Sequence, residues 1–378
     1  MRSRALNLPS TGPPCQPRSD IKQAQIMNSN ARVSLSQHGE FDTDALGRWL
    51  QGRIDGLTLP VRAKRFSDGQ SNPTFLVTDA AARRYVLRKK PAGELLPSAH
   101  AVEREFRVMK ALVASDVPVA KMLCFCDDAA VIGTPFFMME FVQGRIFWDP
   151  ALPELDSSAR RAVYADMNRV VAALHRVDPE AVGLGDFGRS AGFFERQLKR
   201  WSIQYRASET EPIEAMDRLI EWLPAHMPKT QETRIFHGDL RIDNMIFHPT
   251  EPRILAVLDW ELSTLGHPLA DFAYHALPWR LTADQFRGMA DKDIAALGIP
   301  SEAAYLRSYS AATGREVDPG EYEFCMAYSM FRLAAILQGI LKRSIDGTAA
   351  SATAQATGRQ ARVIAEVAWA QVRARAAD

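Results

Sequence analysis

A polar loop between two short apolar runs is the feature that most constrains how this chain folds. Residues 237–244 read His-Gly-Asp-Leu-Arg-Ile-Asp-Asn, and short apolar runs stand before and after them at 234–236 and 245–247. A third apolar run, 254–258, ends on Asp259. Apolar runs of this length, bounded by polar residues, are typical of short strands that flank a loop. The polar side chains at the strand ends can therefore meet at one mouth of a small sheet.

Three of these polar residues, Asp239, Asn244 and Asp259, form a set suited to phosphoryl transfer. The Asp239 carboxylate can accept the proton of an attacking hydroxyl group, and Asn244 and Asp259 can hold Mg²⁺ against nucleotide phosphates. Each residue alone is more typical of a turn or a cap, and His237 alone of a structural hydrogen bond. The joint spacing and the flanking strands favour the catalytic interpretation. Asp243 lies inside the loop, and we interpret it as solvated or structural.

With these residues in view, the chain resembles the aminoglycoside phosphotransferase family, which includes choline-kinase-like enzymes. Within that family it looks similar to the branch found as the kinase domain fused to some acyl-CoA dehydrogenases. The resemblance spans residues 41–345 and is carried by five stretches: 67–75, 85–91, 131–137, 237–244 and 258–271. It implies an α+β, protein-kinase-like two-lobed fold, with an antiparallel-sheet N-lobe and a mostly helical C-lobe. It also implies Mg²⁺ and ATP as cofactors, with GTP as an open alternative.

On this fold we expect three regions: a disordered N-terminal tail at 1–40, a nucleotide-binding N-lobe at 41–143, and a C-lobe at 144–378 with the catalytic loop and acceptor-binding helices. The tail is rich in proline and poor in large apolar residues, which is typical of disorder. Met27 is a candidate for the true first residue, so residues 1–26 need not belong to the native protein.

Composition and charge narrow the classes of partner. The 378 residues are 47% hydrophobic and 24% charged, as in soluble globular proteins, and a net charge of +1 offers no attraction to nucleic acid or to an anionic membrane. No apolar stretch is expected to reach transmembrane length. The four cysteines lack metal-binding spacing, so we expect reduced thiols in a cytoplasmic protein. The expected partner is a small-molecule hydroxyl acceptor, and the oligomeric state stays open.

Periodicity predicts N-lobe strands at 61–66, 74–78, 83–89, 122–126 and 136–141, and helices at 42–50, 98–114, 156–175, 193–205, 213–223, 269–277, 282–297, 301–312, 319–343 and 358–375. The connection at 67–73, between the first two strands, is small and polar. In a kinase-like lobe it would cover the nucleotide phosphates, with donors from the Gly69 backbone and from Ser67, Ser71 and Asn72. It lacks the G-x-G-x-x-G pattern, so an ordinary hairpin turn is the alternative.

The strand at 83–89 carries a candidate phosphate ligand. Kinases place a cation on this strand, and it pairs with the α- and β-phosphates and with a helix glutamate. Arg88 stands two residues after Val86, matching the alanine and lysine of V-A-I-K, so it is the first candidate and Lys89 the second. Glu105, on the following helix, is the candidate ion-pair partner that aims Arg88. An exposed strand charge and a solvated helix face are the alternatives.

Two further positions are assigned by the kinase-like layout. Backbone groups from Glu140 to Val142, after the last N-lobe strand, would bind the adenine edge as a hinge, although the apolar residues nearby suit a plain core equally well. The family resemblance also implies that Asp271, on the helix at 269–277, braces the catalytic loop.

The acceptor should bind in the helical half. A polycationic aminoglycoside needs an acidic pocket, whereas acidic and basic residues are nearly balanced over 280–378. Arg332 stands in an apolar helix, with Arg280 and Arg343 near it in sequence, which favours an anionic acceptor over a cationic one; an arginine that reaches out to solvent is the alternative. The fused-dehydrogenase branch implies hydroxy acids or hydroxyacyl-CoA thioesters. Aminoglycoside or choline-type phosphorylation, and a pseudokinase that binds nucleotide or acyl-CoA without turnover, are the rival functions.

Overall fold

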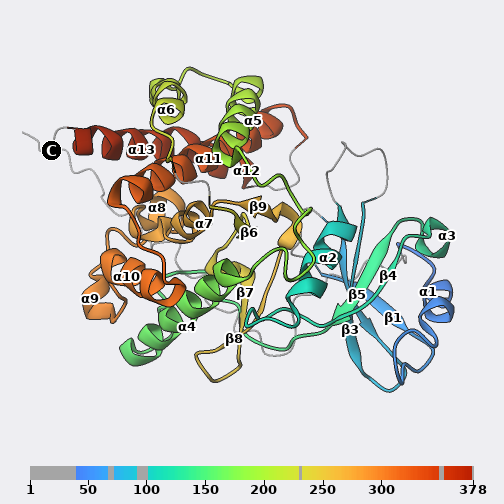
Figure 1. The fold of residues 1–378 in the computed structure, drawn as a ribbon. Coiled ribbons are helices and arrows are strands. Elements are labelled where there is room, and N and C mark those ends of the chain that lie inside the picture. The colour runs from blue at the N-terminus through green and yellow to red at the C-terminus, as the bar shows by residue number, and fades with distance from the viewer. Residues whose placement is uncertain (1–39, 67–71, 92–100, 230–231, 349–352, 377–378) are drawn as a thin grey trace, which may run out of the picture.

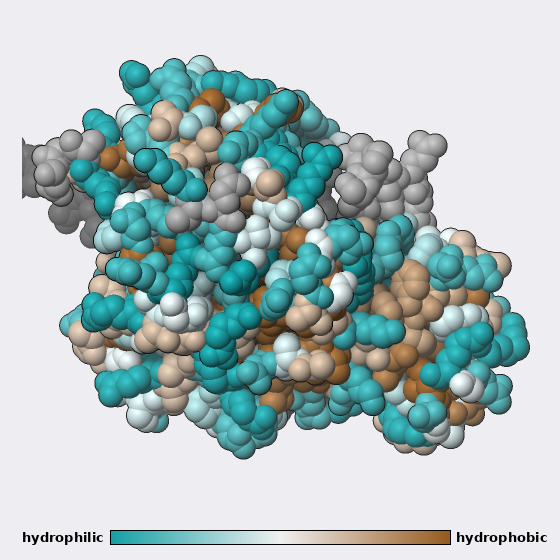
Figure 2. Space-filling model, in the orientation of Figure 1, coloured by the Kyte–Doolittle hydropathy of each residue, from teal (hydrophilic) through white to brown (hydrophobic). Residues whose placement is uncertain are grey.

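The computed structural model describes residues 40–66, 72–91, 101–229, 232–348 and 353–376. Within them the chain forms two lobes, one built on an antiparallel sheet and a larger one that is mostly helical (Figure 1). On the face drawn in Figure 2, hydrophobic residues gather where the two lobes meet, and hydrophilic residues cover much of the helical lobe. The predicted α+β class is confirmed. Of the tail predicted to be disordered, residues 1–39 lie outside the described part of the chain.

The N-lobe is a five-stranded antiparallel sheet in the order β1-β2-β3-β5-β4. All five predicted strands are present within one residue at each end. The elements of this lobe are α1 (Thr43–Leu50), β1 (Arg62–Arg65), β2 (Thr74–Thr78), β3 (Arg84–Lys89), α2 (Val102–Leu112), β4 (Met122–Cys126), α3 (Ala129–Ile132) and β5 (Phe136–Glu140).

Alternation along β3 decides which of its side chains reach the second lobe. Leu87 packs in the apolar cluster on the α1 side of the sheet, whereas Val86 belongs to the main core that includes α2. Because strand side chains alternate, Arg88 shares the face of Val86, and Lys89 shares the face of Leu87. Lys89 is 5% exposed, and its ammonium group lies 5.4 Å from the centre of the Phe41 ring.

The C-lobe surrounds two short antiparallel strand pairs, β6 with β9 and β7 with β8, with helices. Its elements are α4 (Ser157–Arg176), α5 (Phe193–Ser208), α6 (Glu214–Ala225), β6 (Arg234–Phe236), the 3-10 turn η1 (Ile242–Asn244), β7 (Met245–Phe247), β8 (Ile254–Val257), the 3-10 turn η2 (Trp260–Leu262), β9 (Thr264–Gly266), α7 (Pro268–His275), the 3-10 turn η3 (Leu277–Trp279), α8 (Ala283–Phe286), α9 (Ile294–Leu297), α10 (Glu302–Thr313), α11 (Pro319–Ile345), α12 (Ala354–Gly358) and α13 (Gln360–Ala376).

The long helix α11 is the central helix of the C-lobe core. Its length and mean hydropathy of 1.5 are those of a membrane span, so the prediction that no stretch of the chain reaches this length was wrong. However, 83% of its most apolar window is buried inside the protein, against α5, α7 and α13 among others. A helix that is apolar on all sides is expected at the centre of a large helical lobe.

One local prediction was wrong. The helix expected at 282–297 is two short helices, α8 and α9, because Arg287 after α8 takes a left-handed conformation with φ of 48° and ends the first helix. Thr282 and Gln285 form a capping box at its start. The structure also adds two short elements, α12 before the helix predicted at 358–375 and strand β9 before α7.

Candidate active site

One buried carboxylate holds the loop between β6 and β7. Asp271 on α7 accepts the backbone N–H groups of His237 and Gly238 at 2.7 and 2.9 Å, and its side chain is fully buried. His175 Nε2, from α4, lies 3.4 Å away. Burial on its own would raise the pKa of Asp271, but these donors outweigh it and hold the pKa below its usual range. The predicted brace of the catalytic loop is therefore present.

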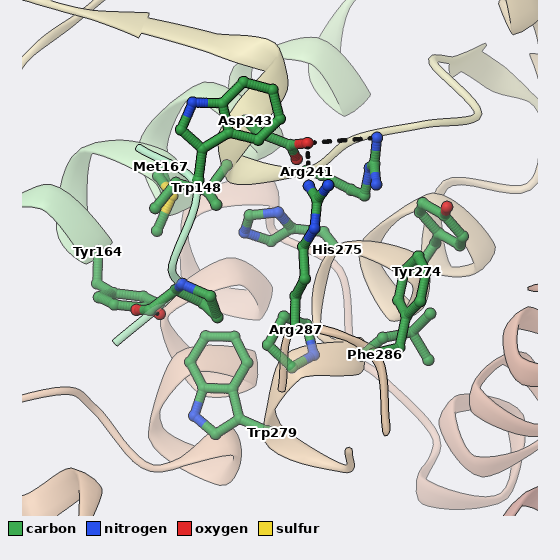
Figure 3. Close-up of a pocket in the computed structure, with 14 residues that line it drawn as sticks. Trp148, Tyr164, Met167, Arg241, Asp243, Tyr274, His275, Trp279, Phe286 and Arg287 are labelled. Carbon is green, nitrogen blue, oxygen red and sulfur yellow. Dashed lines mark hydrogen bonds and ion pairs between the residues drawn. The ribbon is translucent and has the colours of Figure 1, made fainter. Parts of the chain in front are cut away.

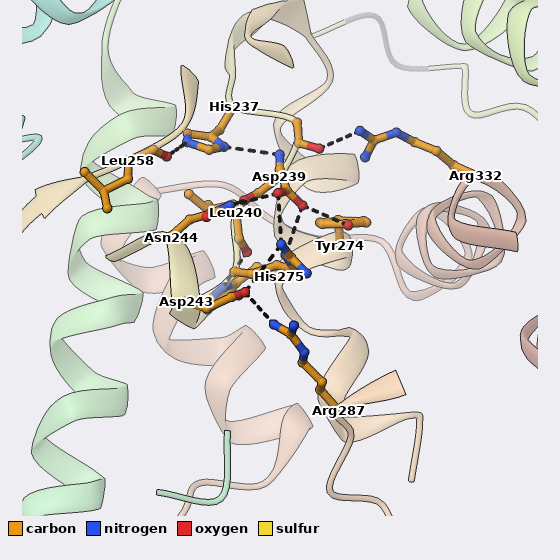
Figure 4. A network of polar contacts seen from close by, with 12 residues as sticks. His237, Asp239, Leu240, Asp243, Asn244, Leu258, Tyr274, His275, Arg287 and Arg332 are labelled. Carbon is orange, nitrogen blue, oxygen red and sulfur yellow. Dashed lines mark hydrogen bonds and ion pairs between the residues drawn. The ribbon is translucent and has the colours of Figure 1, made fainter. Parts of the chain in front are cut away.

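Three further hydrogen bonds fix the loop (Figure 4). Gly238 has a φ of 88°, which favours glycine, and its carbonyl accepts a hydrogen bond from Arg332 Nη2 at 2.6 Å. His237 Nδ1 accepts the Asp239 N–H at 3.1 Å, so the proton resides on Nε2, which donates to the Leu258 carbonyl at 2.9 Å. His237 is thus a structural hydrogen-bonder that joins the loop to the end of β8.

The Asp239 carboxylate receives three hydrogen bonds (Figure 4). The Tyr274 hydroxyl donates to Oδ1 at 3.0 Å, while Asn244 Nδ2 and Arg241 Nη2 donate to Oδ2 at 2.8 and 3.2 Å. Burial would raise the pKa of Asp239, but nearby cations, Arg241 and Arg332 among them, outweigh burial and lower it. Asp239 is therefore ionised at neutral pH, the state that a proton acceptor requires.

Asn244 and Asp259, the predicted Mg²⁺ ligands, lie on neighbouring strand ends. The Leu258 N–H donates to the Asn244 carbonyl at 2.8 Å, and the Asn244 amide nitrogen also donates to the Asp239 carbonyl at 2.8 Å. Asp259 has a φ of 64°, in the left-handed region that few residues other than glycine adopt, aspartate more often than most. An amide oxygen and a one-third-exposed carboxylate are oxygen ligands of the kind Mg²⁺ prefers, so these residues fit the ion.

Mg²⁺ commonly binds through one or two protein ligands and completes its shell with substrate phosphates and water. The described residues contain no group of three or more His, Cys, Asp and Glu side chains suited to a metal ion. Asn244 and Asp259 would supply one or two of the ligands of such an ion, and groups from outside the protein the rest.

Arg88 lies in an ion-pair cluster that joins the two lobes. Its Nη2 is 2.9 Å from Asp259 Oδ1, with hydrogen-bond geometry, and 3.6 Å from Glu261. Its Nε is 2.9 Å from Glu105 Oε2, at ion-pair distance but without hydrogen-bond geometry. The predicted pairing of Arg88 with Glu105 is therefore confirmed. Lys89 points to the opposite face of the sheet, so Arg88 is the cation that reaches this site.

Glu105 is almost fully buried, and this burial raises its pKa to about 7 although Arg88 opposes the shift. The Asn72 amide donates to Glu105 Oε1 at 2.5 Å and is 1% exposed. Asn72, predicted as a phosphate donor, therefore also supports the ion pair, a contact that no local pattern signals. The other predicted phosphate donors, Ser67, Gly69 and Ser71, lie outside the described residues.

The predicted hinge follows β5. The Glu140 N–H donates to the Lys121 carbonyl at 2.9 Å, so this group is used within the N-lobe. The backbone of the next two residues, through Val142, is the part of the predicted hinge that lies beyond β5. After this point the chain crosses to the C-lobe, where Arg145 exchanges two backbone hydrogen bonds of 2.8 Å with Phe247. The predicted lobe boundary at 143/144 lies just before Arg145, where the chain enters the C-lobe.

A pocket lies beside the catalytic loop (Figure 3). Tyr274 and Arg241 line it and also contact Asp239, so Asp239 stands between the pocket and the candidate metal ligands. Burial lowers the pKa of His275 to about 4, which keeps this pocket residue neutral. The lining residues are Trp148, Pro150, Tyr164, Met167, Arg241, Ile242, Asp243, Tyr274, His275, Leu277, Pro278, Trp279, Phe286 and Arg287.

Two charges expected near the acceptor are paired within the protein. Of the two interpretations of Asp243, solvated or structural, the structural one holds, because its side chain is 6% exposed and pairs with Arg241 and Arg287. Arg280 is bound by Glu302 and Glu323, so it is not available to an anionic acceptor.

The three basic residues singled out in the sequence do not line the pocket. Arg332 is buried and supports the catalytic loop instead of reaching out to solvent, and Arg343 lies in the last turn of α11. The positive charge of the pocket comes from Arg241 and Arg287, which sequence reasoning missed.

Comparisons with known proteins agree with this geometry. The sequence matches the phosphotransferase enzyme family over residues 62–317. Mouse "Acyl-CoA dehydrogenase family member 10" is 50% identical over 330 residues, which cover 86% of this chain and 31% of that protein. "Probable acyl-CoA dehydrogenase IBR3" of Arabidopsis thaliana is 40% identical over 346 residues, 86% of this chain and 42% of that protein. The crystal structure of a putative aminoglycoside phosphotransferase from Ralstonia eutropha is 52% identical, with a TM-score of 0.82, and covers 88% of this chain and 98% of that one.

The chain belongs to the phosphotransferase enzyme family that includes the aminoglycoside phosphotransferases, and it has their protein-kinase-like fold. The predicted similarity to the kinase domain of acyl-CoA dehydrogenase family members is confirmed. The chain spans less than half the length of these curated relatives.

Proposed function

We propose that this chain is a Mg²⁺-dependent small-molecule kinase that transfers the γ-phosphate of ATP to the hydroxyl group of a hydroxy acid or hydroxyacyl-CoA. One observation carries the proposal. The ionised Asp239 carboxylate contacts Asn244, a candidate metal ligand, on one side and two residues of the pocket, Tyr274 and Arg241, on the other. A base in this position lies between a nucleotide and an acceptor.

The chain's residues divide the work of phosphoryl transfer. Asp239 accepts the proton of the acceptor hydroxyl as its oxygen attacks phosphorus. Arg88, held by Glu105, binds the α- and β-phosphates. Asn244 and Asp259 hold the Mg²⁺, which supplies charge neutralisation to the phosphates when it is bound. The transition state is loose, so positioning and electrostatic stabilisation account for most of the catalysis.

The pocket favours an anionic, partly apolar acceptor. Its single aspartate, Asp243, is already paired with two arginines, so it offers no carboxylate to a polycationic aminoglycoside. The apolar and aromatic walls suit an acyl chain, and the names of the curated relatives join this kind of domain to acyl-CoA chemistry. Ring faces such as those of Trp148 and Trp279 are the observation that keeps a choline-type acceptor as the second candidate.

A turnover screen with Mg·ATP tests the proposal. Its acceptors are hydroxy acids, hydroxyacyl-CoAs, choline and aminoglycosides, and Asp239→Asn is the inactive control. We expect a hydroxy acid or its thioester to be phosphorylated, with kcat lower by about 10²- to 10⁴-fold in the variant. Phosphorylation of choline or an aminoglycoside alone would overturn the acceptor class. Nucleotide binding without turnover on any acceptor would favour the pseudokinase, and GTP in place of ATP would change only the donor.

A further inference from the structure

Two arginines share one aspartate at the wall of the pocket. Arg241 and Arg287 place their guanidinium groups on either side of the Asp243 carboxylate (Figure 3), with Arg241 Nη2 at 3.4 Å from Asp243 Oδ2. Asp243 is almost buried, whereas Arg287 is about half exposed. Among the described residues that line the pocket no other charged group occurs, because His275 is neutral. Within the lining two cations face one anion, and the Asp239 carboxylate beside the pocket balances the second cation through Arg241.

The backbone holds Arg287 in place at some energetic cost. Its φ of 48° is rare for a residue with a side chain, and such strain persists where the surrounding structure requires it. The next residue, Gly288, has no room for a Cβ because the Leu281 backbone lies against it. The guanidinium of Arg287 also lies 5.2 Å from the centre of the Trp148 ring, which is half exposed. The charged group is thus fixed beside the apolar walls of the pocket.

Arg241 has a second partner, the catalytic carboxylate. Its Nη2 donates to Asp239 Oδ2 at 3.2 Å, and its Nε lies 3.1 Å from Oδ1 (Figure 4). Tyr274, Asn244 and Arg241 Nη2 take up three of the four lone-pair directions of the carboxylate, and Arg241 Nε stands near the remaining one, on Oδ1, at ion-pair distance but without hydrogen-bond geometry. An acceptor hydroxyl therefore finds that remaining direction crowded by the Arg241 guanidinium.

We propose that Arg241 and Arg287 form the site for an anionic group of the acceptor, a carboxylate or a phosphate, and that its binding draws Arg241 off Asp239 and exposes the base. This inference rests on the proposed kinase function. A planar guanidinium pair matches the oxygens of such an anion, and Asp243 keeps the two groups together before the acceptor arrives. No bond forms or breaks at the anion site; the only proton transferred goes from the acceptor hydroxyl to Asp239.

Matched acceptors test the anion site. Straight-chain hydroxy acids are compared with their amides, and CoA thioesters with pantetheine thioesters, which lack the nucleotide phosphates. Arg287→Asn removes the guanidinium, and asparagine tolerates the left-handed backbone. Arg218→Gln, on α6 outside the pocket, is the control. We expect wild type and R218Q to have a higher kcat/KM with one anionic acceptor than with its neutral partner. In R287N the ratio of these two kcat/KM values should fall about 10- to 100-fold.

Arg241→Met tests the exposure of the base. If Arg241 occupies Asp239, the substitution frees the carboxylate, so kcat with the neutral amide rises while the preference for the acid falls. A fall in kcat with both acceptors would show that Arg241 acts on the transferred phosphoryl group, and would overturn the coupling.

The remaining outcomes separate this inference from the proposed function. Turnover without any preference for an anionic acceptor overturns the anion site and leaves the kinase function standing. If no acceptor is turned over, calorimetry measures the binding of the hydroxy acid in the presence of Mg²⁺ and a non-hydrolysable ATP analogue. Acid binding that is lost in R287N would support the anion site while the kinase proposal fails, and equal binding of acid and amide would reject the site.

Discussion

The brace beneath the catalytic loop offers the sharpest test of how the fold supports the site. In Asp271→Asn the amide keeps one acceptor oxygen, so one of the two backbone N–H groups, from His237 or Gly238, meets an NH₂ group instead. A buried donor without a partner costs about 1–3 kcal/mol, and hydrogen bonds to a charged acceptor are worth about 1.5–3 kcal/mol. We therefore expect the free energy of unfolding to fall by about 2–4 kcal/mol. Because the loop also carries Asp239, kcat should fall about 10- to 100-fold.

Urea denaturation measures the stability change, and steady-state kinetics measures kcat and the KM for ATP. The KM should change little, since Arg88 and Glu105 do not contact Asp271. Amide hydrogen exchange at His237 and Gly238 should speed up even without a known acceptor. Asp346→Asn, which removes only an exposed pair with Lys342, is the control. If the free energy of unfolding of Asp271→Asn lies within about 0.5 kcal/mol of the wild-type value and kcat is unchanged, Asp271 does not hold the loop in this way.

Three further predictions concern the N-lobe and its connection. Below about pH 7 Glu105 takes up a proton, because its pKa is raised to about 7, and Arg88 keeps only Asp259 and Glu261 as charged partners. The KM for ATP should therefore rise as pH falls through 7, and a KM in Glu105→Gln with the same pH dependence would contradict this. Lys89→Met should keep kcat/KM, whereas Arg88→Lys should lower it about 10-fold or more, since only Arg88 reaches the site. A larger loss of kcat/KM in Lys89→Met than in Arg88→Lys would reject Arg88 as the phosphate ligand. Gly144→Ala should lower the free energy of unfolding by about 1–3 kcal/mol, because the added Cβ meets Phe247 and Ile246. An unchanged melting temperature in thermal unfolding would show that the backbone at Gly144 can move to make room for it.

The local patterns of the sequence predicted much of the fold and the identity of several site residues. Alternation on the strand at 83–89 separated Arg88 from Lys89, because neighbouring strand residues point to opposite faces whatever the rest of the fold does. The spacing of Asp239, Asn244 and Asp259 along a loop and a strand end is likewise local. Such patterns involve residues close together in sequence, so they could be identified before the fold was known.

The tertiary structure decided which charges meet. The sequence left Asp243 open between a solvated and a structural role, and Arg287, 44 positions later, pairs with it in the structure. Arg280 looked available to an acceptor, yet two glutamates bind it. Whether a charge is buried and paired depends on helices and strands from distant parts of the chain that pack around it. Neither hydrophobic periodicity nor a local motif predicts that packing. The sequence by itself therefore determined the chemistry of the loop, whereas only the packing of α4, α7 and α8 against it decided the pocket.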